Sequence, residues 1–370
     1  MSPKKVIISG GGTGGHIFPA ISIANALKVI ESDIEILFVG ALGRMEMEKV
    51  PKAGYPIVGL PVMGFPRKLS LKMLKFFTGL LKSTQQARKI VDEFKPNAVV
   101  GVGGYASGPL LRVASRRGIP CLIQEQNSYP GITNRMLAKK VRCICVAYEG
   151  LDKYFPAEKL ILTGNPVRQD LIELDDKKRE AVEFFGLDPE LPVVLSLGGS
   201  LGAYTINEAI GNNISVFENQ KIQVLWQTGK SYIGKAEEVI RTGKSNYIKA
   251  FDFIYRMDLA FTVADIVVSR AGASTISELC VIGKPAIFVP SPNVSEDHQT
   301  KNAMALVNKD AALMVKDIEA SYELAPAILS LVGNKELQNK LSENIQKMAI
   351  LNSAETIAKK VIEIADEGSK

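Results

Sequence analysis

The feature that most constrains the fold of this chain occurs once in each half: a short apolar run, a glycine-rich loop and a helical segment. In the first half, Lys5–Ser9 leads into Gly10–Gly15 and then into the helical spacing of Ile17–Val29. In the second half, Pro192–Leu197 leads into Gly198–Ala203. A strand that passes through a tight glycine turn into a helix is the opening of a doubly wound parallel sheet. The chain is therefore expected to hold two such sheets.

Further apolar runs of strand length alternate with helical stretches along both halves. They are Ile34–Val39, Asn97–Val102, Pro120–Gln124, Val141–Val146, Ile222–Gln227, Ala264–Ser269 and Pro285–Val289. This rhythm predicts parallel strands with helices on both faces of each sheet. The turn-rich segment Leu162–Arg168 separates the two series, and a polar helical segment, Asp175–Phe185, follows it. The last helix, Ser353–Asp366, has no strand after it and could pack on either domain.

Composition excludes several classes of protein. Of the 370 residues, 46% are hydrophobic and 23% charged, as in a soluble globular protein. The 4 Cys and 2 His are too few and too scattered for a zinc or His-rich metal site, and the cysteines are expected to be core hydrophobes. The chain starts with no signal-like segment and has no apolar stretch of about 20 residues, so an intracellular protein without a membrane span is expected.

Charge is divided unevenly between the halves. Residues 1–165 carry 23 Lys and Arg against 11 Asp and Glu, whereas residues 166–370 carry 22 against 28. The basic half is expected to face a polyanion or an anionic surface. No Asp-x-Asp occurs, so a carboxylate-bound divalent cation is not indicated.

The first glycine loop, Gly10–Gly15, ends at His16 and contains the spacing G-x-G-x-x-G. The second strand ends without the acidic residue expected for NAD, and no Gly-Lys-Ser/Thr follows as in a P-loop. The loop is therefore interpreted as a phosphate or pyrophosphate site, with a merely tight turn as the alternative. His16 lies at a helix start, where the dipole disfavours imidazolium, so a neutral ring could accept a proton; capping or packing is the alternative.

Polar residues follow other strands at the positions where a parallel sheet binds its ligands. Gln124–Asn127 ends one strand, and Glu125 is a candidate base or orienting carboxylate. Gly198–Ala203 could hold a second phosphate, and Glu278, one turn inside the helix after Ser269–Gly272, could take two ribose hydroxyls. An ordinary solvated role is the alternative for Glu278. Glu296–Gln299 follows a further strand.

A basic and apolar helix is expected over Leu71–Lys82. No acidic residue occurs between Glu48 and Asp92, a stretch that holds nine Lys and Arg. Apolar side chains beside lysines favour an interfacial membrane helix, with an ordinary core-packed helix as the alternative. The residues assigned to this membrane patch are Lys72, Lys75, Phe76, Phe77, Leu80 and Lys82.

Taken together, these segments resemble the MurG-type N-acetylglucosaminyltransferases of bacterial peptidoglycan synthesis, which form part of glycosyltransferase family 28. The matching stretches run in order over nearly the whole chain. They are Gly11–Pro19, Gly101–Pro109, Glu125–Asn127, Gly164–Arg168, Gly198–Ala203, Arg270–Glu278 and Glu296–Gln299.

The resemblance implies a GT-B fold, with two Rossmann-like domains facing across a cleft. It implies an acceptor- and membrane-facing domain of residues 1–166 with 351–370, and a UDP-GlcNAc-binding domain of residues 167–350. The implied reaction is an inverting, metal- and cofactor-independent transfer of GlcNAc from UDP-GlcNAc to the 4-hydroxyl of MurNAc in undecaprenyl-pyrophosphoryl-MurNAc-pentapeptide (lipid I), giving lipid II. The implied location is peripheral, on the cytoplasmic face of an anionic bacterial membrane, with other cell-wall synthesis proteins as further partners.

The resemblance also implies site residues. The catalytic residues would be His16 and Glu125. UDP-GlcNAc would be bound by Thr13, Gly14, Gly15, Asn127, Arg168, Ser200, Ile254, Ala273, Ser274, Thr275, Glu278 and Gln299. The lipid acceptor would meet Thr13, Gly14, His16 and Tyr105.

One position departs from the family. A His often precedes Glu-Gln-Asn in these enzymes, whereas this chain has Gln124, which cannot act as a general base. His16 or Glu125 must then take the proton, and the sequence does not choose between them. The rival readings are another GT-B enzyme, such as a UDP-GlcNAc 2-epimerase or a glycolipid glycosyltransferase, and a nucleotide-sugar sensor without turnover. Nucleic-acid binding is disfavoured because the basic region lacks base-stacking or groove-reading elements.

Overall fold

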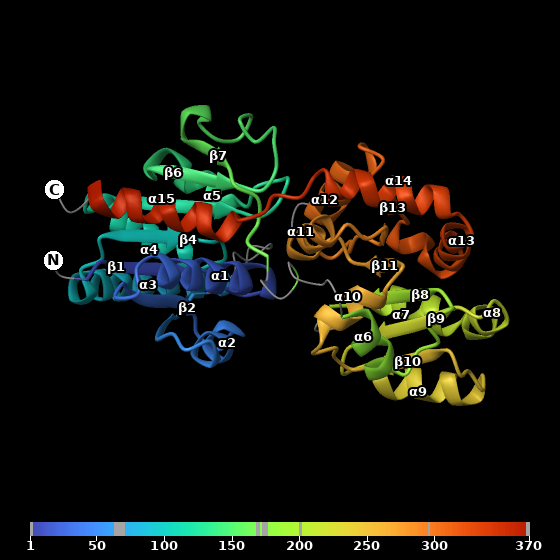
Figure 1. The fold of residues 1–370 in the computed structure, drawn as a ribbon. Helices are drawn as coiled ribbons and strands as arrows, with labels where there is room; N and C mark the ends of the chain where they lie inside the picture. The colour runs from blue at the N-terminus through green and yellow to red at the C-terminus, as the bar shows by residue number, and fades with distance from the viewer. Residues whose placement is uncertain are drawn as a thin grey trace. The chain divides into compact units, whose positions relative to one another are not determined.

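A computed structural model describes residues 3–62, 71–167, 171, 177–199, 202–294 and 297–367, with the side chains of residues 71–77 left out. The chain forms two compact units (Figure 1). Unit 1 comprises Met1–Val167 and Ile350–Lys370, and unit 2 comprises Arg168–Ala349. Each unit is built on its own parallel sheet.

Unit 1 alternates strands and helices as the sequence predicts. Its elements are β1 (Lys5–Ser9), α1 (Gly14–Ile30), β2 (Glu35–Ala41), α2 (Glu46–Lys52), β3 (Ile57–Leu60), α3 (Leu71–Phe94), β4 (Ala98–Gly101), α4 (Ser107–Arg116), β5 (Cys121–Glu125), α5 (Ile132–Leu137), β6 (Cys143–Val146), β7 (Leu160–Leu162) and α15 (Ser353–Glu367). The seven strands are parallel, in the order β3-β2-β1-β4-β5-β6-β7.

Both faces of this sheet are covered, as the unbroken apolar run of β1 requires. Val6 and Ile8 point into a core shared with α1, and Ile7 points into the opposite core with α4. The last helix, α15, packs against α1 with residues spaced i, i+1, i+4, i+7 and i+8, so its apolar stripe closes the first of these cores (Figure 1).

Unit 2 repeats the plan after a fresh start. Its elements are α6 (Lys178–Phe185), β8 (Val193–Leu197), α7 (Tyr204–Gly211), α8 (Ile214–Asn219), β9 (Gln223–Gln227), α9 (Ile233–Thr242), β10 (Ile248–Phe251), α10 (Met257–Val263), β11 (Ile266–Ser269), α11 (Ala273–Ile282), β12 (Ala286–Phe288), α12 (His298–Val307), β13 (Leu313–Met314), α13 (Ala320–Val332) and α14 (Lys335–Gln346). The strand order is β10-β9-β8-β11-β12-β13, again parallel.

The expected α/β class, with two doubly wound parallel sheets, is confirmed. The sequence reading missed four strands: β3, β7, β10 and β13. All four are sheet edges, are only partly buried and are two to four residues long, so each gives a weak strand pattern in the sequence. The expectation for the four cysteines is confirmed, since all are buried and free.

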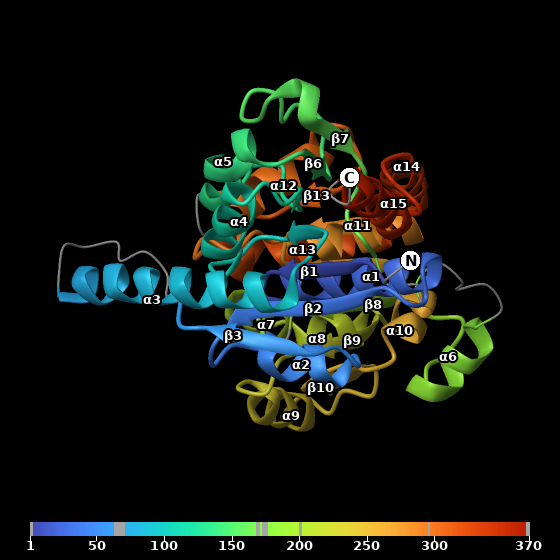
Figure 2. The same ribbon diagram turned by 90° about the vertical axis from the view of Figure 1, so that its left-hand side faces the viewer.

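The helix α3 connects β3 to β4, as a crossover helix does, but its N-terminal part projects beyond the sheet of unit 1 (Figure 2). Farther along α3, Leu81 is 67% exposed and Lys82 is exposed too. Among the described residues, no helix combines the length and the apolar character needed to cross a bilayer.

Candidate active site

Strand order reverses in unit 1 between β1 and β4, and the loops that follow these two strands lie against each other. A Cβ on Gly104 would come within 2.5 Å of the Gly11 carbonyl oxygen, and Gly104 has φ +86°. The Ser107 hydroxyl lies 2.9 Å from both the Ser9 and the Gly103 carbonyl oxygens, to which it donates. This reversal point is where open α/β sheets bind ligands.

His16 lies in the first turn of α1, inside this pair of loops. Its Nδ1 is 3.1 Å from the Gly11 carbonyl oxygen and 3.3 Å from the Thr13 hydroxyl. A carbonyl oxygen only accepts, so the shorter contact assigns the proton to Nδ1 and leaves the lone pair on Nε2. The other edge of the ring packs on Gly103, where an added Cβ would lie 2.8 Å from both Cδ2 and Nε2.

Glu125 ends β5 and is 1% exposed. Its Oε1 accepts from the Asn127 amide N–H (3.1 Å) and from Asn127 Nδ2 (3.2 Å). Its Oε2 accepts from the Gly131 N–H (3.1 Å) and from Asn134 Nδ2 (2.8 Å). Burial raises the pKa of the Glu125 carboxyl, and these four hydrogen bonds oppose that rise. The carboxylate therefore holds the loop after β5 in place, with Asn127 at its start.

Gln124, the position that departs from the family, belongs to a buried amide network. Its Nε2 donates to Asn165 Oδ1 (2.8 Å), and Asn165 Nδ2 donates to the Gln126 carbonyl (3.0 Å). Gln126 in turn donates to the Val102 carbonyl (2.8 Å) and to the Gln124 side chain. An amide can fill this place because the network uses it as both donor and acceptor.

Sequence reasoning missed Glu46, which begins α2 and is 1% exposed. Its Oε1 accepts from the Ala41 N–H and its Oε2 from the Gly12 N–H, both at 2.9 Å. An acidic residue thus reaches the first glycine loop from five residues beyond the end of β2. The only signal in the sequence was its place just after the second strand.

In unit 2 the order reverses between β8 and β11. The loop after β8 lies against Thr228, which follows β9: Gly202 has φ +80°, and an added Cβ would lie 2.2 Å from the Thr228 carbonyl oxygen, so only glycine fits. Arg270, directly after β11, pairs with Asp317 and donates to the Val289 carbonyl (2.9 Å) and the Thr205 hydroxyl (3.0 Å). This arginine fixes the loops around the reversal point.

The helix α11 begins at this point and carries the sequence-predicted donor residues on its first turns. Ala273 is its first residue, and Ser274, Thr275 and Glu278 follow. Within the described part of the chain, Ser274 Oγ is buried and has no hydrogen-bond partner. Gln299, in the first turn of α12, accepts through Oε1 from the Ser291 N–H (2.8 Å), which fixes its amide beside the loop after β12.

Gln227, also missed from the sequence, links two of these segments. Its Nε2 donates to the Gly199 carbonyl (3.2 Å), and its Oε1 accepts from the Ile254 N–H (2.9 Å). Ile254 is 3% exposed, and its N–H is engaged by Gln227 rather than turned outward. The glycine loop after β8 and the segment after β10 are therefore held together.

The remaining predicted residues are placed as follows. Thr13 precedes α1 and is exposed, Gly14 and Gly15 are the first residues of α1, and Tyr105 is 51% exposed in the loop after β4. Leu80 is half-buried on α3, and Lys82 is exposed there. Arg168, Ser200 and Glu296 lie outside the described residues, and so do the side chains of Lys72, Lys75, Phe76 and Phe77.

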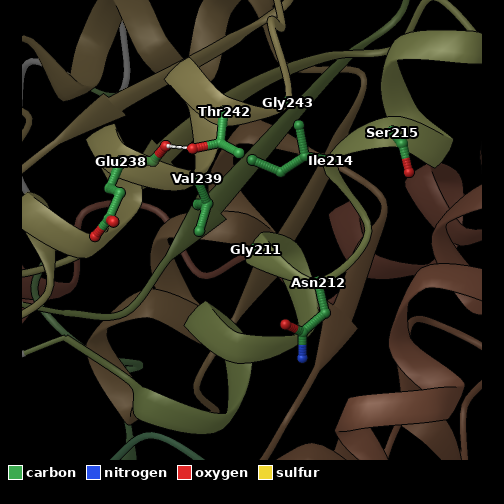
Figure 3. Close-up of a pocket in the computed structure, with 8 residues that line it drawn as sticks. All are labelled: Gly211, Asn212, Ile214, Ser215, Glu238, Val239, Thr242 and Gly243. Atoms are coloured by element: carbon green, nitrogen blue, oxygen red, sulfur yellow. Dashed lines mark hydrogen bonds between the residues drawn. The ribbon is translucent and has the colours of Figure 1, made fainter.

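Unit 2 also has a pocket, which Figure 3 shows in close-up. It is lined by Gly211, Asn212, Ile214, Ser215, Glu238, Val239, Thr242 and Gly243, which end α7 and α9 or begin α8. None of these residues belongs to the loops that follow the strands, where an open parallel sheet binds its ligands. Across the described residues, no group of three or more His, Cys, Asp or Glu side chains could hold a metal ion.

Both halves of the chain match family models. Residues 6–146 match the glycosyltransferase family 28 N-terminal domain, and residues 193–361 match the C-terminal domain of the same family. A relative from Parabacteroides distasonis is 55% identical over 99% of this chain and 100% of its own length. One from Cytophaga hutchinsonii is 53% identical, over 100% and 99%. Both are described as UDP-N-acetylglucosamine--N-acetylmuramyl-(pentapeptide) pyrophosphoryl-undecaprenol N-acetylglucosamine transferase.

Solved structures agree on the fold. The crystal structure of Acinetobacter baumannii MurG is similar with a TM-score of 0.79 and 26% identity, over 98% of this chain and 100% of that one. A UDP-GlcNAc 2-epimerase from Neisseria meningitidis, bound to UDP-GlcNAc, has a TM-score of 0.68 at 15% identity, over 97% and 100%. At that identity the epimerase shares the fold alone.

Proposed function

Since this chain belongs to glycosyltransferase family 28, we propose that it transfers GlcNAc from UDP-GlcNAc to the MurNAc unit of lipid I and so makes lipid II. The observation that carries the proposal is the full-length match at 55% identity to a relative described as that transferase. A merely shared fold would not carry it, because the 2-epimerase has the same fold at much lower identity.

Most residues of the donor site are assigned to unit 2. The N-terminus of α11 offers unpaired backbone N–H groups to the diphosphate, and the Ser274 hydroxyl lies buried there without a partner in the described residues. Ala273 and Thr275 line the same turn, Glu278 takes the ribose, and Gln299 and Asn127 contact GlcNAc. Arg168 and Ser200 meet the diphosphate, and the backbone of Ile254 meets uracil.

The acceptor site is assigned to unit 1, where Thr13, Gly14, Gly15 and Tyr105 face the pyrophosphate and sugar of lipid I. His16 is the general base, because its Nδ1 is hydrogen-bonded to a carbonyl and Nε2 keeps the lone pair. Glu125 is a positioning residue instead, because both of its oxygens already accept two hydrogen bonds each.

The chemical step follows from these roles. The 4-hydroxyl oxygen of MurNAc attacks the anomeric carbon of GlcNAc from the face opposite UDP, and the new glycosidic bond forms as the bond to the diphosphate oxygen breaks. The hydroxyl proton passes to His16 Nε2. UDP leaves with the bonding electrons, and the α11 N-terminus with Arg168 stabilises its added charge.

An enzyme that acts on a lipid-linked acceptor must reach a membrane. We therefore propose a peripheral position on the cytoplasmic face of an anionic membrane. Positions 1–165 carry 23 basic and 11 acidic residues, and this positive charge favours an anionic surface. The exposure of Leu81 beside Lys82 on α3 favours it as well. The residues that we propose to meet the membrane are Lys72, Lys75, Phe76, Phe77, Leu80 and Lys82. Other cell-wall synthesis proteins are proposed as neighbours there.

The proposal is tested by incubating the protein with radiolabelled UDP-GlcNAc, a short-chain lipid I analogue and excess EDTA. Label is expected in the lipid fraction, and His16→Gln should lower kcat by about 10²–10⁴-fold while thermal stability is retained. Glu48→Gln, an exposed change in the same unit, is the matched control. Release of free ManNAc would instead indicate an epimerase, and UDP-GlcNAc binding without turnover would indicate a sensor.

A further inference from the structure

Glu46 is a buried carboxylate that is held by backbone groups. Its two oxygens each accept one backbone N–H at 2.9 Å, from Ala41 and Gly12, and it makes no ion pair with Lys or Arg among the residues that the structure describes. A buried charge without a cation is costly, so its surroundings must be built to keep it.

Two glycines make room for this carboxylate. A Cβ on Gly11 would lie 2.1 Å from Glu46 Oε1, and a Cβ on Gly40 would lie 2.5 Å from Glu46 Cγ. Gly11 has φ +152° and Gly12 has φ +88°, conformations that side chains at these positions would oppose. The loop is therefore shaped around Glu46 as well as around a ligand.

The same peptide group connects Glu46 to His16. The Gly12 N–H donates a hydrogen bond to Glu46 Oε2, and the Gly11 carbonyl oxygen lies 3.1 Å from His16 Nδ1. This N–H and this carbonyl belong to the same peptide group. Hydrogen bonds in series polarise one another, so a carboxylate on the N–H strengthens the carbonyl as an acceptor. The Glu46 carboxylate, the Gly11–Gly12 peptide and the His16 imidazole thus form one chain of hydrogen bonds.

A competing arrangement is available to the histidine. The Thr13 hydroxyl, 3.3 Å from Nδ1, could donate to an unprotonated Nδ1, and the ring proton would then sit on Nε2. That tautomer could not take a proton at Nε2. The balance between the two depends on how strongly the Gly11 carbonyl attracts the Nδ1 proton.

We propose that Glu46 is a positioning residue for the transfer reaction, which fixes His16 as its Nδ1–H tautomer through the Gly11–Gly12 peptide. Its charge also stabilises the imidazolium that forms when Nε2 accepts the sugar hydroxyl proton. In a Ser-His-Asp triad a carboxylate does this by direct contact; here an amide stands between. The kinetic consequence rests on the proposed role of His16 as the base, whereas the tautomer does not.

The chain offers a clean measurement because it has only two histidines, His16 and His298. In a His298→Gln background with ¹⁵N-labelled histidine, imidazole NMR reports on His16 alone. The parent should show a protonated Nδ1 and an unprotonated Nε2. Glu46→Gln should shift the population toward the Nε2–H form. Adding Thr13→Val, which removes the competing donor, should restore the Nδ1–H form.

Kinetics give the second readout, in the chain with both histidines. Glu46→Gln should lower kcat by roughly 10- to 100-fold, as loss of residues that orient functional histidines does elsewhere. KM for UDP-GlcNAc should change little, because the two residues that donate to Glu46, Ala41 and Gly12, are not among those assigned to the donor. Glu48→Gln is the matched control: it makes the same change two residues along α2, at a side chain that is 62% exposed.

Two results would overturn the proposal: an Nε2–H tautomer in the parent protein, or a tautomer that Glu46→Gln leaves unchanged. The first needs no substitution at Glu46, so it holds even if that variant folds poorly. If the tautomer shifts as expected but His16→Gln retains full transfer activity, the positioning role stands and the assignment of His16 as the base fails.

Discussion

The choice between His16 and Glu125 can be decided by one substitution, Glu125→Gln. The glutamine keeps a single oxygen acceptor, so its amide group faces two of the four donors that Glu125 now accepts. Two hydrogen bonds to a charged group are lost, each contributing about 1.5–3 kcal/mol. Burial raises the pKa of Glu125 because a buried carboxylate is poorly solvated. The neutral glutamine avoids this desolvation cost, which offsets part of the loss. We expect a net destabilisation of about 2–4 kcal/mol.

The assay combines stability with turnover. Thermal unfolding followed by circular dichroism should show the midpoint falling by about 4–16 °C, given about 2–4 °C per kcal/mol for a unit of this size. Hydrogen exchange should speed up at the Asn127 and Gly131 amides, which donate to the carboxylate. Since Asn127 is assigned to GlcNAc, KM for UDP-GlcNAc should rise along with the loss of stability.

His16→Gln provides the contrast, with kcat strongly reduced and the midpoint nearly unchanged. The positioning role of Glu125 is wrong if Glu125→Gln keeps the parent's stability and exchange rates while kcat falls about 10³-fold or more. Glu125 would then be the base, and its four hydrogen bonds would serve to set its pKa.

Three further predictions follow from contacts in each unit. Gly103→Ala should lower kcat about 10- to 100-fold, because the added Cβ would press on the His16 ring. Gly118→Ala controls for backbone strain, because Gly118 has φ +75° but open space around it. Equal losses of kcat in the two variants would show that contact with His16 is not the cause. Gln227→Met should raise KM for UDP-GlcNAc about tenfold in steady-state assays, because it leaves the buried Ile254 N–H without its acceptor; an unchanged KM would argue against this link. Arg256 lowers the pKa of Asp258 from 3.8 to about 2, so Asp258 stabilises the fold above about pH 4 and less as the pH falls toward 2. Urea unfolding should therefore show that Asp258→Asn lowers the free energy of unfolding by about 1–2 kcal/mol at pH 7 and by less below pH 4. A decrease that does not depend on pH would contradict this role of Asp258.

Much of the candidate site could be read from the sequence because its parts sit where strands end. Glycine loops, His16, Gln124–Asn127 and the start of α11 all follow apolar runs, and in a parallel sheet such positions gather at one edge. Glu46 and Gln227 could not be found in this way. Each acts through a side chain that bonds to backbone far along the chain, and no spacing in the sequence reports such a contact.

The fold class, the two glycine loops and the central strands follow from the sequence, because buried parallel strands require unbroken apolar runs and tight turns require glycine. The other features depend on contacts that form only in the folded chain. The edge strands have weak patterns and are defined by the neighbour they pair with, and α15 finds its place only through the apolar face of α1. The role of Glu46 also depends on such contacts: Glu46 accepts a hydrogen bond from the Gly12 N–H, 34 residues away in the chain, whereas the donors to Glu125 all lie within nine residues of it.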